Sequence, residues 1–308
     1  MNSVVGESLS MPEAMRQHTN DVGCNLCGGS DAYRMFRKNG VDFLRCRGCG
    51  LEFVHPLPDM ASMRALYSSE RYYSTDNISQ YGYDDYVRNK HLTVNLFNRR
   101  LDDILLYTDG QRGRLLDVGC ATGVLLELAR LRGWEVHGVD VSEYATGIAR
   151  DYYNLDVVTG DLAEAAYLDG YFDVVVMDDV IEHVADPAAL VVEAHRVLKP
   201  GGLLTINTPN RAGIWHRLMG KRWFHYKQTE HTYFFSPRVI TRLLEERGFQ
   251  VLDAHPSSKI IDLSYAFGRL RYYNGGVSSL LQRTVGRLML ASITFPIRVG
   301  EMAVFAKK

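Results

Sequence analysis

The sequence predicts an α/β fold preceded by a small cysteine-rich module. From Arg114 onward, an apolar strand (RLLDVG), a glycine-containing loop (CATG) and a helical segment (VLLELARLRG) follow one another, which is the pattern of a strand–helix–strand unit. Upstream of this unit, eighteen residues separate two Cys-x-x-Cys pairs. A chain of 308 residues can hold one core of about 150 to 200 residues and one smaller module.

The composition is that of an ordinary globular protein. Hydrophobic residues make up 46% of the chain and charged residues 23%, and the formal net charge is -1. A chain with this charge has no broad positive field that would attract polyanions. Nucleic acid is therefore not the favoured partner.

Neither end of the chain carries a targeting or membrane signal. Residues 1–20 contain no basic start followed by an apolar run, so we expect a disordered tail there and not a secretory signal. The longest apolar stretch near the C-terminus, residues 288–297, is about half of the ~20 residues that a spanning helix needs. We expect a cytoplasmic protein without a transmembrane segment.

The cysteine-rich module, residues 21–58, is predicted to be a zinc ribbon. Cys24 and Cys27 form one pair, Cys46 and Cys49 form the other, and the intervening residues are typical of a hairpin. Each pair can direct two thiolates at one ion, and two pairs complete the tetrahedral sulfur shell that structural zinc prefers. Because all four positions are cysteine, no coordination site remains for a substrate, so this zinc should be structural.

The glycine loop after the first strand predicts a cofactor site. The second strand ends at Asp140, 21 residues after Gly119, which is the spacing of a carboxylate that binds a ribose diol. A dinucleotide is the first rival ligand. However, Asp117 precedes the first glycine, where it would repel a pyrophosphate and attract a ligand that carries an ammonium and a sulfonium. Asp161 follows the third strand, either to accept from an adenine amine or to cap a helix.

Two later stretches, FDVVVMDDVIEHVADP and HRVLKPGGLLTINTPN, complete the pattern. With them, residues 114–249 resemble the class I S-adenosylmethionine-dependent methyltransferases, and most closely the branch with the ubiquinone-pathway O-methyltransferases. The resemblance implies a Rossmann-like, seven-stranded mixed sheet of order 3-2-1-4-5-7-6, with an antiparallel seventh strand at 301–308. The chain departs from the family at Ala121, where glycine is usual.

The resemblance also assigns the binding residues of S-adenosylmethionine. The residues expected to line the methionine, ribose and adenine parts of the cofactor are Asp117, Gly119, Cys120, Gly123, Asp140, Val141, Asp161, Leu162, Met177 and Asp178.

Candidate catalytic residues follow the fourth strand. Asp179, Glu182 and His183 are spaced to share one face of a helical turn, and His231 follows the fifth strand. Three interpretations stay open: a site for a second divalent metal such as magnesium, a general base that orients the acceptor, or architecture. The metal interpretation comes from resemblance to small-RNA 2'-O-methyltransferases, although Asp179 stands where they have glutamate.

The remaining segments are predicted from composition. Residues 59–110 are expected to form a helical, tyrosine-rich connector, in which Tyr81, Tyr83 or Tyr86 is a candidate to close over the cofactor. The methyltransferase domain, 111–308, would carry a lid at 209–235, whose aromatic residues either line the acceptor pocket or pack the segment down. A helical insertion at 261–299 is expected to cover that pocket, to form a homodimer surface or to contact a membrane peripherally.

These features favour methyl transfer from S-adenosylmethionine to a small-molecule biosynthetic intermediate. The acceptor would be a sugar, a nucleotide sugar or a natural product, and O-methylation is favoured over C-methylation. The alternative is an RNA-modifying methyltransferase in which the zinc ribbon binds the substrate. A binding protein with a degenerate fold is a third hypothesis, which the intact Asp117, Gly119 and Asp140 disfavour.

Overall fold

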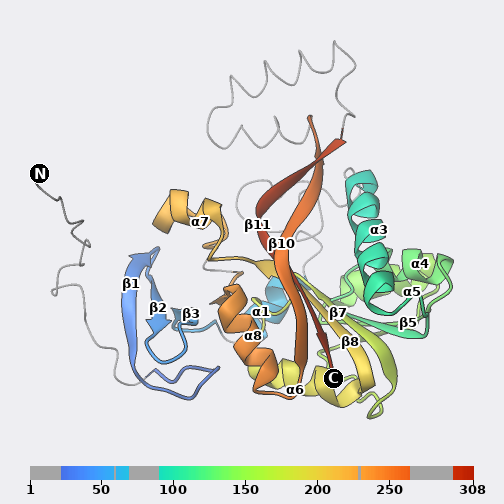
Figure 1. Cartoon of the computed structure of the whole chain (residues 1–308), viewed down its shortest axis with the longest axis horizontal. Coiled ribbons are helices and arrows are strands. Elements are labelled where there is room, and N and C mark those ends of the chain that lie inside the picture. Colours follow the sequence, from blue (N-terminus) through green and yellow to red (C-terminus); the bar gives the residue numbers. More distant parts are fainter. Residues whose placement is uncertain (1–21, 59, 69–89, 228–229, 264–293) are drawn as a thin grey trace, which may run out of the picture.

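The computed structural model describes residues 22–58, 60–68, 90–227, 230–263 and 294–308. In this part of the chain, two sheets lie beside each other, a small one near the N-terminus and a large one with helices on both faces (Figure 1). None of the helices within the described ranges combines the length and apolar character of a membrane-spanning helix. The predicted tail at residues 1–20 lies outside the described residues.

The large sheet has the predicted order of strands. Its strands are β4 (Arg114–Val118), β5 (Glu135–Asp140), β6 (Val157–Thr159), β7 (Phe172–Asp178), β8 (Leu198–Pro209), β10 (Gln250–Asp262) and β11 (Thr294–Lys307). They are arranged β10-β11-β8-β7-β4-β5-β6, and β11 is antiparallel to both of its neighbours. The Rossmann-like order 3-2-1-4-5-7-6 is therefore confirmed.

Helices cover the two faces of this sheet. They are α3 (Lys90–Tyr107), α4 (Val124–Leu131), α5 (Glu143–Tyr153), α6 (Pro187–Val197) and α8 (Pro237–Glu245). A short helix, α7 (Ile214–Met219), and a 3-10 turn at Gly220–Arg222 follow β8 and contain no buried residues. Successive residues of β4 face opposite ways, because Leu115 packs with α3 and α4 while Leu116 packs with α6 and α8. Both faces of the sheet are thus buried, as expected for parallel strands.

Capping residues set where three of the helices begin. Ser142, Asp186 and Ser236 each accept a hydrogen bond from a backbone amide of the first turn, in α5, α6 and α8 respectively. Pro187 and Pro237 stand at the first helical position of α6 and α8, where the missing amide hydrogen costs nothing. These starts fix the loops that precede the helices, and those loops carry several candidate site residues.

The N-terminal module, residues 22–58, contributes three strands to the small sheet. β1 (Ala32–Lys38) and β2 (Val41–Cys46) form the predicted hairpin, and β3 (Glu52–His55) follows. Asn39 and Gly40 make the turn with φ values of 49° and 82°, the conformation that matches the twist of a two-residue hairpin.

A fourth strand of the small sheet comes from a much later part of the chain, after β8. β9 (Tyr233–Phe234), which lies in the predicted lid, pairs antiparallel with β3. Trp223, Tyr226 and Phe234 are buried and pack against the N-terminal module. Of the two interpretations of the lid's aromatic residues, packing applies to these three. They join the module to the large sheet, and burial of apolar area is the reason.

The connector and the insertion also differ from expectation. Residues 60–67 (α1, Met60–Tyr67) and 90–107 are helical, as predicted, but α3 packs against α4 and β10 and so belongs with the large sheet. The ends of the predicted helical insertion at 261–299 are strand and not helix, because β10 continues to Asp262 and β11 begins at Thr294. Residues 69–89 and 264–293 lie outside the described residues.

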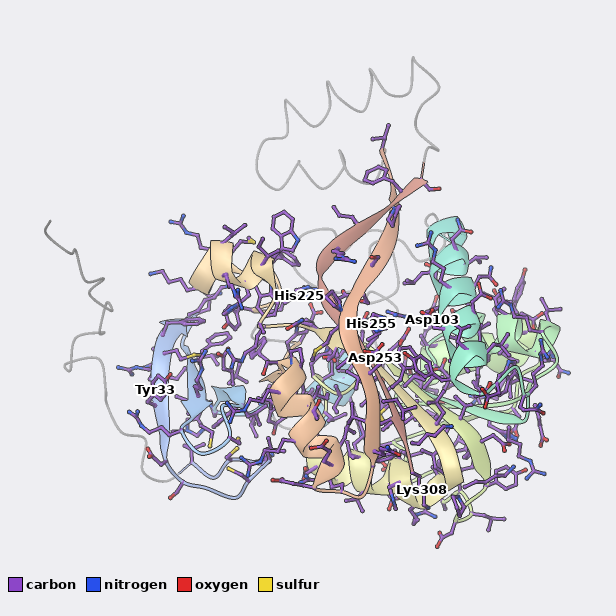
Figure 2. All side chains as sticks on the ribbon, viewed as in Figure 1. Tyr33, Asp103, His225, Asp253, His255 and Lys308 are labelled. Carbon is purple, nitrogen blue, oxygen red and sulfur yellow. The ribbon has the colours of Figure 1, made fainter. Side chains whose placement is uncertain are left out.

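Polar contacts fasten β10 and the last residue to their neighbours. Asp253 Oδ2 accepts a hydrogen bond from Tyr107 Oη at 3.0 Å and lies 2.9 Å from His255 Nδ1. Figure 2 shows Asp253 and His255 on β10 and Asp103 on α3. Lys308 Nζ donates to the carbonyls of His195 and Leu198 at 2.6 and 2.8 Å. His195 thus lies in a structural contact, away from the strand ends where cofactors bind.

A buried ionic cluster links the N-terminal module to the segment after β8. The Glu52 carboxylate is 0% exposed. Arg45 Nε donates to it at 2.9 Å, Arg211 Nη1 lies 3.1 Å away, and Tyr226 Oη donates at 2.8 Å. Arg45 lies on the module, whereas Arg211 and Tyr226 follow β8.

Replacement of Glu52 by alanine should destabilise the protein strongly. It leaves two guanidinium groups without their shared carboxylate, and breaking a buried pair in this way costs about 3–5 kcal/mol. The matched control is Asp102→Ala, which removes an exposed ion pair with Arg132 and should cost less than about 1 kcal/mol. Urea unfolding of both variants measures the difference, and equal costs would contradict the role of the cluster.

Candidate active site

A pocket opens at the carboxyl ends of β4, β5 and β7, where open α/β sheets place their ligands. It is lined by Met63, Arg64, Tyr67, Val118, Gly119, Ala121, Val139, Asp140, Val141, Gly160, Asp161, Leu162, Asp179, Val180, His183, Val184 and Leu190. Half of the ten predicted cofactor residues are among them. The other half lie behind the pocket wall, as described below.

The loop after β4 requires glycine where it approaches the pocket. Gly119 has a φ of 75°, and a Cβ there would lie 2.5 Å from Val180 Cγ2. Ala121, where the family usually has glycine, also has a positive φ of 47°. This conformation explains why glycine is usual at that position: alanine adopts it at some cost in backbone strain.

Asp140 holds this loop and faces the pocket. Its Oδ2 accepts from the amide of Ala121 at 2.9 Å and its Oδ1 accepts from the amide of Ser142 at 2.8 Å. Burial raises the pKa of Asp140, while these two amides lower it. A carboxylate offers about four lone-pair directions, so Asp140 can also accept from a diol.

The hydrogen bonds of Asp161 are those of a capping residue. Its Oδ1 accepts from the amide of Glu164 at 2.9 Å, and Glu164 Oε2 accepts from the amide of Asp161 at 2.8 Å, which is a capping box. Arg64 Nη2 lies 3.1 Å from Asp161 Oδ2. Asp161 nevertheless lines the pocket with Leu162, so an adenine contact remains compatible with its capping role.

Asp117 and Asp178 lie behind the pocket wall. Burial raises the pKa of Asp117 well above its ordinary value, and the neighbouring Asp178 and Asp140 raise it further. Asp178 pairs with the buried Arg100 of α3 at 3.2 Å. Sequence reasoning missed Arg100, which is one of two adjacent arginines on α3, because nothing local shows which of them pairs with a buried acid.

Three other predicted residues support the loop from behind. Cys120 is buried, and burial raises the pKa of its thiol. Gly123 begins α4, and a Cβ there would lie 2.5 Å from Leu155 Cδ1. Met177 is a core residue of β7. The structure therefore places these residues beside the predicted site, where they shape it without lining it.

Helix α1 covers the pocket, a feature that sequence reasoning missed. Met63, Arg64 and Tyr67 lie on one side of this helix, with the three- and four-residue spacing of a helical face, and all three line the pocket. The tyrosines predicted to close over the cofactor, Tyr81, Tyr83 and Tyr86, lie outside the described residues.

The candidate catalytic residues form a buried cluster next to the pocket. Glu182, His183 and His231 each offer one ligand atom, and these atoms lie within 4.8 Å of one another. His183 also lines the pocket. Asp179 lines the pocket but is not part of the three-residue cluster, and Asn207 Nδ2 donates to its carboxylate at 3.2 Å. The predicted four-residue metal set is thus reduced to three in this structure.

Hydrogen bonds define the tautomer of His183. Its Nδ1 lies 2.9 Å from the carbonyl oxygen of Glu230 and 2.7 Å from Tyr67 Oη. Because a carbonyl only accepts, Nδ1 carries the proton and Nε2 carries the lone pair. Nε2 lies 3.8 Å from Glu182 Oε1, a buried atom without a hydrogen-bond partner among the described residues. This lone pair is available to a proton, an acceptor or a metal ion.

Burial dominates the electrostatics of the cluster. It lowers the pKa of His183 to about 4 and that of His231 well below its ordinary value. It raises the pKa of Glu182 well above its ordinary value, and the charge of Asp179 raises it further. Both imidazoles are therefore neutral at pH 7, the form that accepts a proton or binds a metal.

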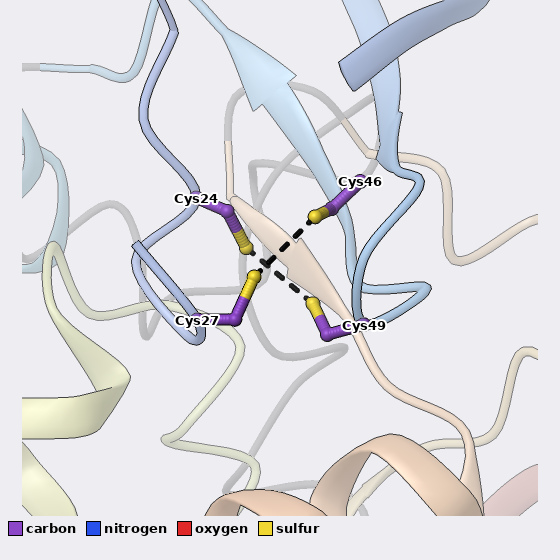
Figure 3. A group of neighbouring side chains, drawn as sticks. All are labelled: Cys24, Cys27, Cys46 and Cys49. Carbon is purple, nitrogen blue, oxygen red and sulfur yellow. Dashed lines mark hydrogen bonds between the residues drawn. The ribbon is translucent and has the colours of Figure 1, made fainter. Parts of the chain in front are cut away.

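The four cysteines of the N-terminal module converge on one point (Figure 3). Cys24 Sγ lies 3.5 Å from Cys49 Sγ, Cys27 Sγ lies 3.5 Å from Cys46 Sγ, and all four thiols are free. Zn–S bonds of about 2.3 Å in a tetrahedron separate the sulfurs by about 3.8 Å, so the residues fit zinc. The pKa of Cys24 is lowered to about 5, first because Cys49 donates a hydrogen bond to it.

Replacement of Asp117 by asparagine should stabilise the ligand-free protein while weakening cofactor binding. The folded-state pKa of Asp117 is raised, so the fold loses stability as the pH rises above the unfolded-state pKa of this carboxyl, and an amide removes this cost. We expect a Tm about 2–4 °C higher at pH 7, the shift from roughly 1 kcal/mol in a domain of this size. S-adenosylmethionine should bind about 10-fold more weakly, because a cationic ligand in the adjacent pocket loses the attraction of this carboxylate.

Thermal unfolding and titration calorimetry measure the two effects separately. A lower Tm at pH 7 would contradict the electrostatic argument, and an unchanged affinity would remove Asp117 from the cofactor site.

Comparisons with known proteins agree with the geometry of the pocket. A family model described as a methyltransferase domain matches residues 89–254, just over half of the chain. The ubiquinone biosynthesis O-methyltransferase of Idiomarina loihiensis is 32% identical over 196 residues, which cover 54% of this chain and 78% of that protein. The protein of the same name from Pseudomonas aeruginosa is 36% identical over 104 residues, 32% of this chain and 45% of that protein. The chain thus spans about half the length of the latter relative.

A solved structure shares the fold. Phosphoethanolamine N-methyltransferase 2 of Haemonchus contortus, in complex with S-adenosyl-L-methionine, has a TM-score of 0.53 at 19% identity, covering 87% of this chain and 64% of that one. Since the family model, the relatives and the sheet order agree, the chain belongs to the class I S-adenosylmethionine-dependent methyltransferases.

Proposed function

We propose that this protein transfers a methyl group from S-adenosylmethionine to a hydroxyl group of a small-molecule biosynthetic intermediate. One observation carries the proposal: His183 lines the cofactor pocket and also belongs to the buried cluster with Glu182 and His231. A cofactor in the pocket supplies an electrophilic methyl group on a sulfonium. The cluster provides the groups that can orient a nucleophile beside it.

A hydroxyl acceptor must lose its proton during transfer, and the cluster fits this task. The proton on His183 Nδ1 is held by Glu230, so the lone pair of Nε2 can accept from the acceptor. His231 Nδ1 is buried without a hydrogen-bond partner among the described residues, so it offers a second polar contact. The names of the similar ubiquinone biosynthesis O-methyltransferases also support oxygen as the methylated atom.

As the alternative to proton acceptance by His183 Nε2, a second divalent cation would bind at this cluster through Glu182, His183 and His231. Two imidazoles and one carboxylate suit manganese, cobalt or zinc better than magnesium, which prefers oxygen ligands. His183 would bind through Nε2, because its other ring nitrogen donates to a backbone carbonyl, as is usual for metal-bound histidine.

The acceptor is proposed to be small, such as a sugar, a nucleotide sugar or a natural product. Helix α1 covers the pocket through Met63, Arg64 and Tyr67, which favours an enclosed ligand over a long polymer. The net charge of -1 gives no support to the alternative, an RNA substrate.

Zinc is proposed as the ion of the N-terminal module, with a structural role. None of the module's cysteines lines the cofactor pocket. A module of this size buries too little surface to fold alone, so the metal would supply part of its stability.

Metal analysis tests the zinc proposal. We expect one zinc per chain in the purified protein and its loss in Cys49→Ser, with a lower Tm, because three ligands bind the ion more weakly than four. Cys120→Ser is the matched control, since Cys120 belongs to the glycine loop, and this variant should keep its zinc. Equal zinc contents in both variants would refute the assignment.

Labelled S-adenosylmethionine, offered with a panel of phenols, sugars and nucleotide sugars, tests the reaction. His231→Ala should lower kcat by about 100-fold, because it removes the polar contact that helps to orient the acceptor and a small misplacement can cost this much, with an unchanged dissociation constant for S-adenosylmethionine. His195→Ala, which alters a structural histidine, is the control and should keep full activity. Cofactor binding without transfer to any member of the panel would count against a small-molecule acceptor.

A further inference from the structure

The buried catalytic cluster is assembled from two separate segments of the chain. Glu182 and His183 follow β7, whereas His231 precedes β9. Thr232 joins them, because its amide and its hydroxyl both donate to the carbonyl of Glu182 at 2.8 Å. The amide of Tyr233 donates to the same carbonyl at 3.2 Å. The spacing of the two histidines therefore depends on residues 232–233.

The N-terminal module holds those two residues from the other side. Phe53 of β3 is paired with Tyr233 of β9, and the amide of Val54 donates to the carbonyl of Thr232 at 3.0 Å. Tyr233 is buried in the same apolar cluster as Cys24, Leu26 and Cys46. The segment next to His231 is thus a strand of the sheet that also carries the metal-binding cysteines.

Asn25, in the turn between Cys24 and Cys27, contacts both segments of the cluster. Its Nδ2 donates to the carbonyl of Ala185 at 3.0 Å and to Tyr233 Oη at 2.6 Å. Tyr233 Oη in turn donates to the carbonyl of Ala185 at 2.7 Å. Since a carbonyl only accepts, the amide nitrogen must face Ala185, so the orientation of Asn25 is fixed by its partners.

We infer that Asn25 is a positioning residue that couples the four-cysteine site to the catalytic cluster. Metal binding fixes the Cys24–Cys27 turn, the turn fixes Asn25, and Asn25 holds the loop of His183 against the segment of His231. The inference rests on the proposed function for its catalytic consequence. Its structural part, the link between the metal-binding turn and residues 232–233, stands on the hydrogen bonds alone.

Asn25→Ala tests the coupling without removing a cysteine. Hydrogen exchange of the Thr232 and Tyr233 amides, followed by mass spectrometry of a peptide that contains them, should accelerate at least about 10-fold. The reason is that Asn25 no longer holds residues 182–185, whose Glu182 carbonyl accepts hydrogen bonds from both amides. The zinc content should stay at that of the unaltered protein. The dissociation constant of S-adenosylmethionine should change less than about threefold, while kcat falls about 10-fold, a change of roughly 1.4 kcal/mol.

Ser30→Ala, an exposed change in the same module, is the matched control and should alter none of these quantities. If Asn25→Ala itself loses zinc, Tyr233→Phe replaces it, since that variant removes the hydroxyl shared by Asn25 and Ala185 and leaves the turn intact. Removal of the metal from the unaltered protein by a chelator should reproduce the faster exchange of the same peptide.

Unchanged exchange in the variant that retains zinc would overturn the coupling. Faster exchange with full kcat would overturn its role in positioning. The exchange measurement needs no methyl acceptor, so failure to find a substrate would count against the proposed function and leave the structural link testable.

Discussion

The pairing of β3 with β9 is the constraint on which the arrangement of this protein depends. It spans two residues on each strand, yet it joins the N-terminal module to a segment about 180 positions later. Around it lie the ionic cluster at Glu52 and the packed aromatic residues after β8, and His231 comes two residues before β9. Together with the hydrogen bonds of Asn25, this pairing makes the module and the large sheet one packed unit.

The large sheet could be predicted almost completely from the sequence. Each of its parallel strands is an apolar run that ends in a loop with a recognisable glycine or acid, such as Gly119 or Asp140. The repeated strand–helix pattern then restricts the order of the strands. The cysteine pairs were equally readable, because their spacing is specific for convergence on one point.

The remaining features had no local signal. A two-residue strand such as β9 has no periodicity, so the segment around it was interpreted as a lid. The buried Arg100 of α3 pairs with Asp178 of β7, and no pattern in the sequence relates a helix residue to an acid on a distant strand. Helix α1 was predicted as part of a helical connector, but its position over the pocket was not. All three cases are tertiary contacts between segments of low intrinsic preference.

The position of β11 between β8 and β10 has a consequence for folding during synthesis. On the ribosome, β8 leaves the exit tunnel well before β11 is translated, so one edge of the sheet stays unpaired while roughly 100 residues are added. An open edge is a template for wrong pairing. The cysteine turns emerge earlier still, so their four thiols are available to a metal ion while the central sheet is incomplete.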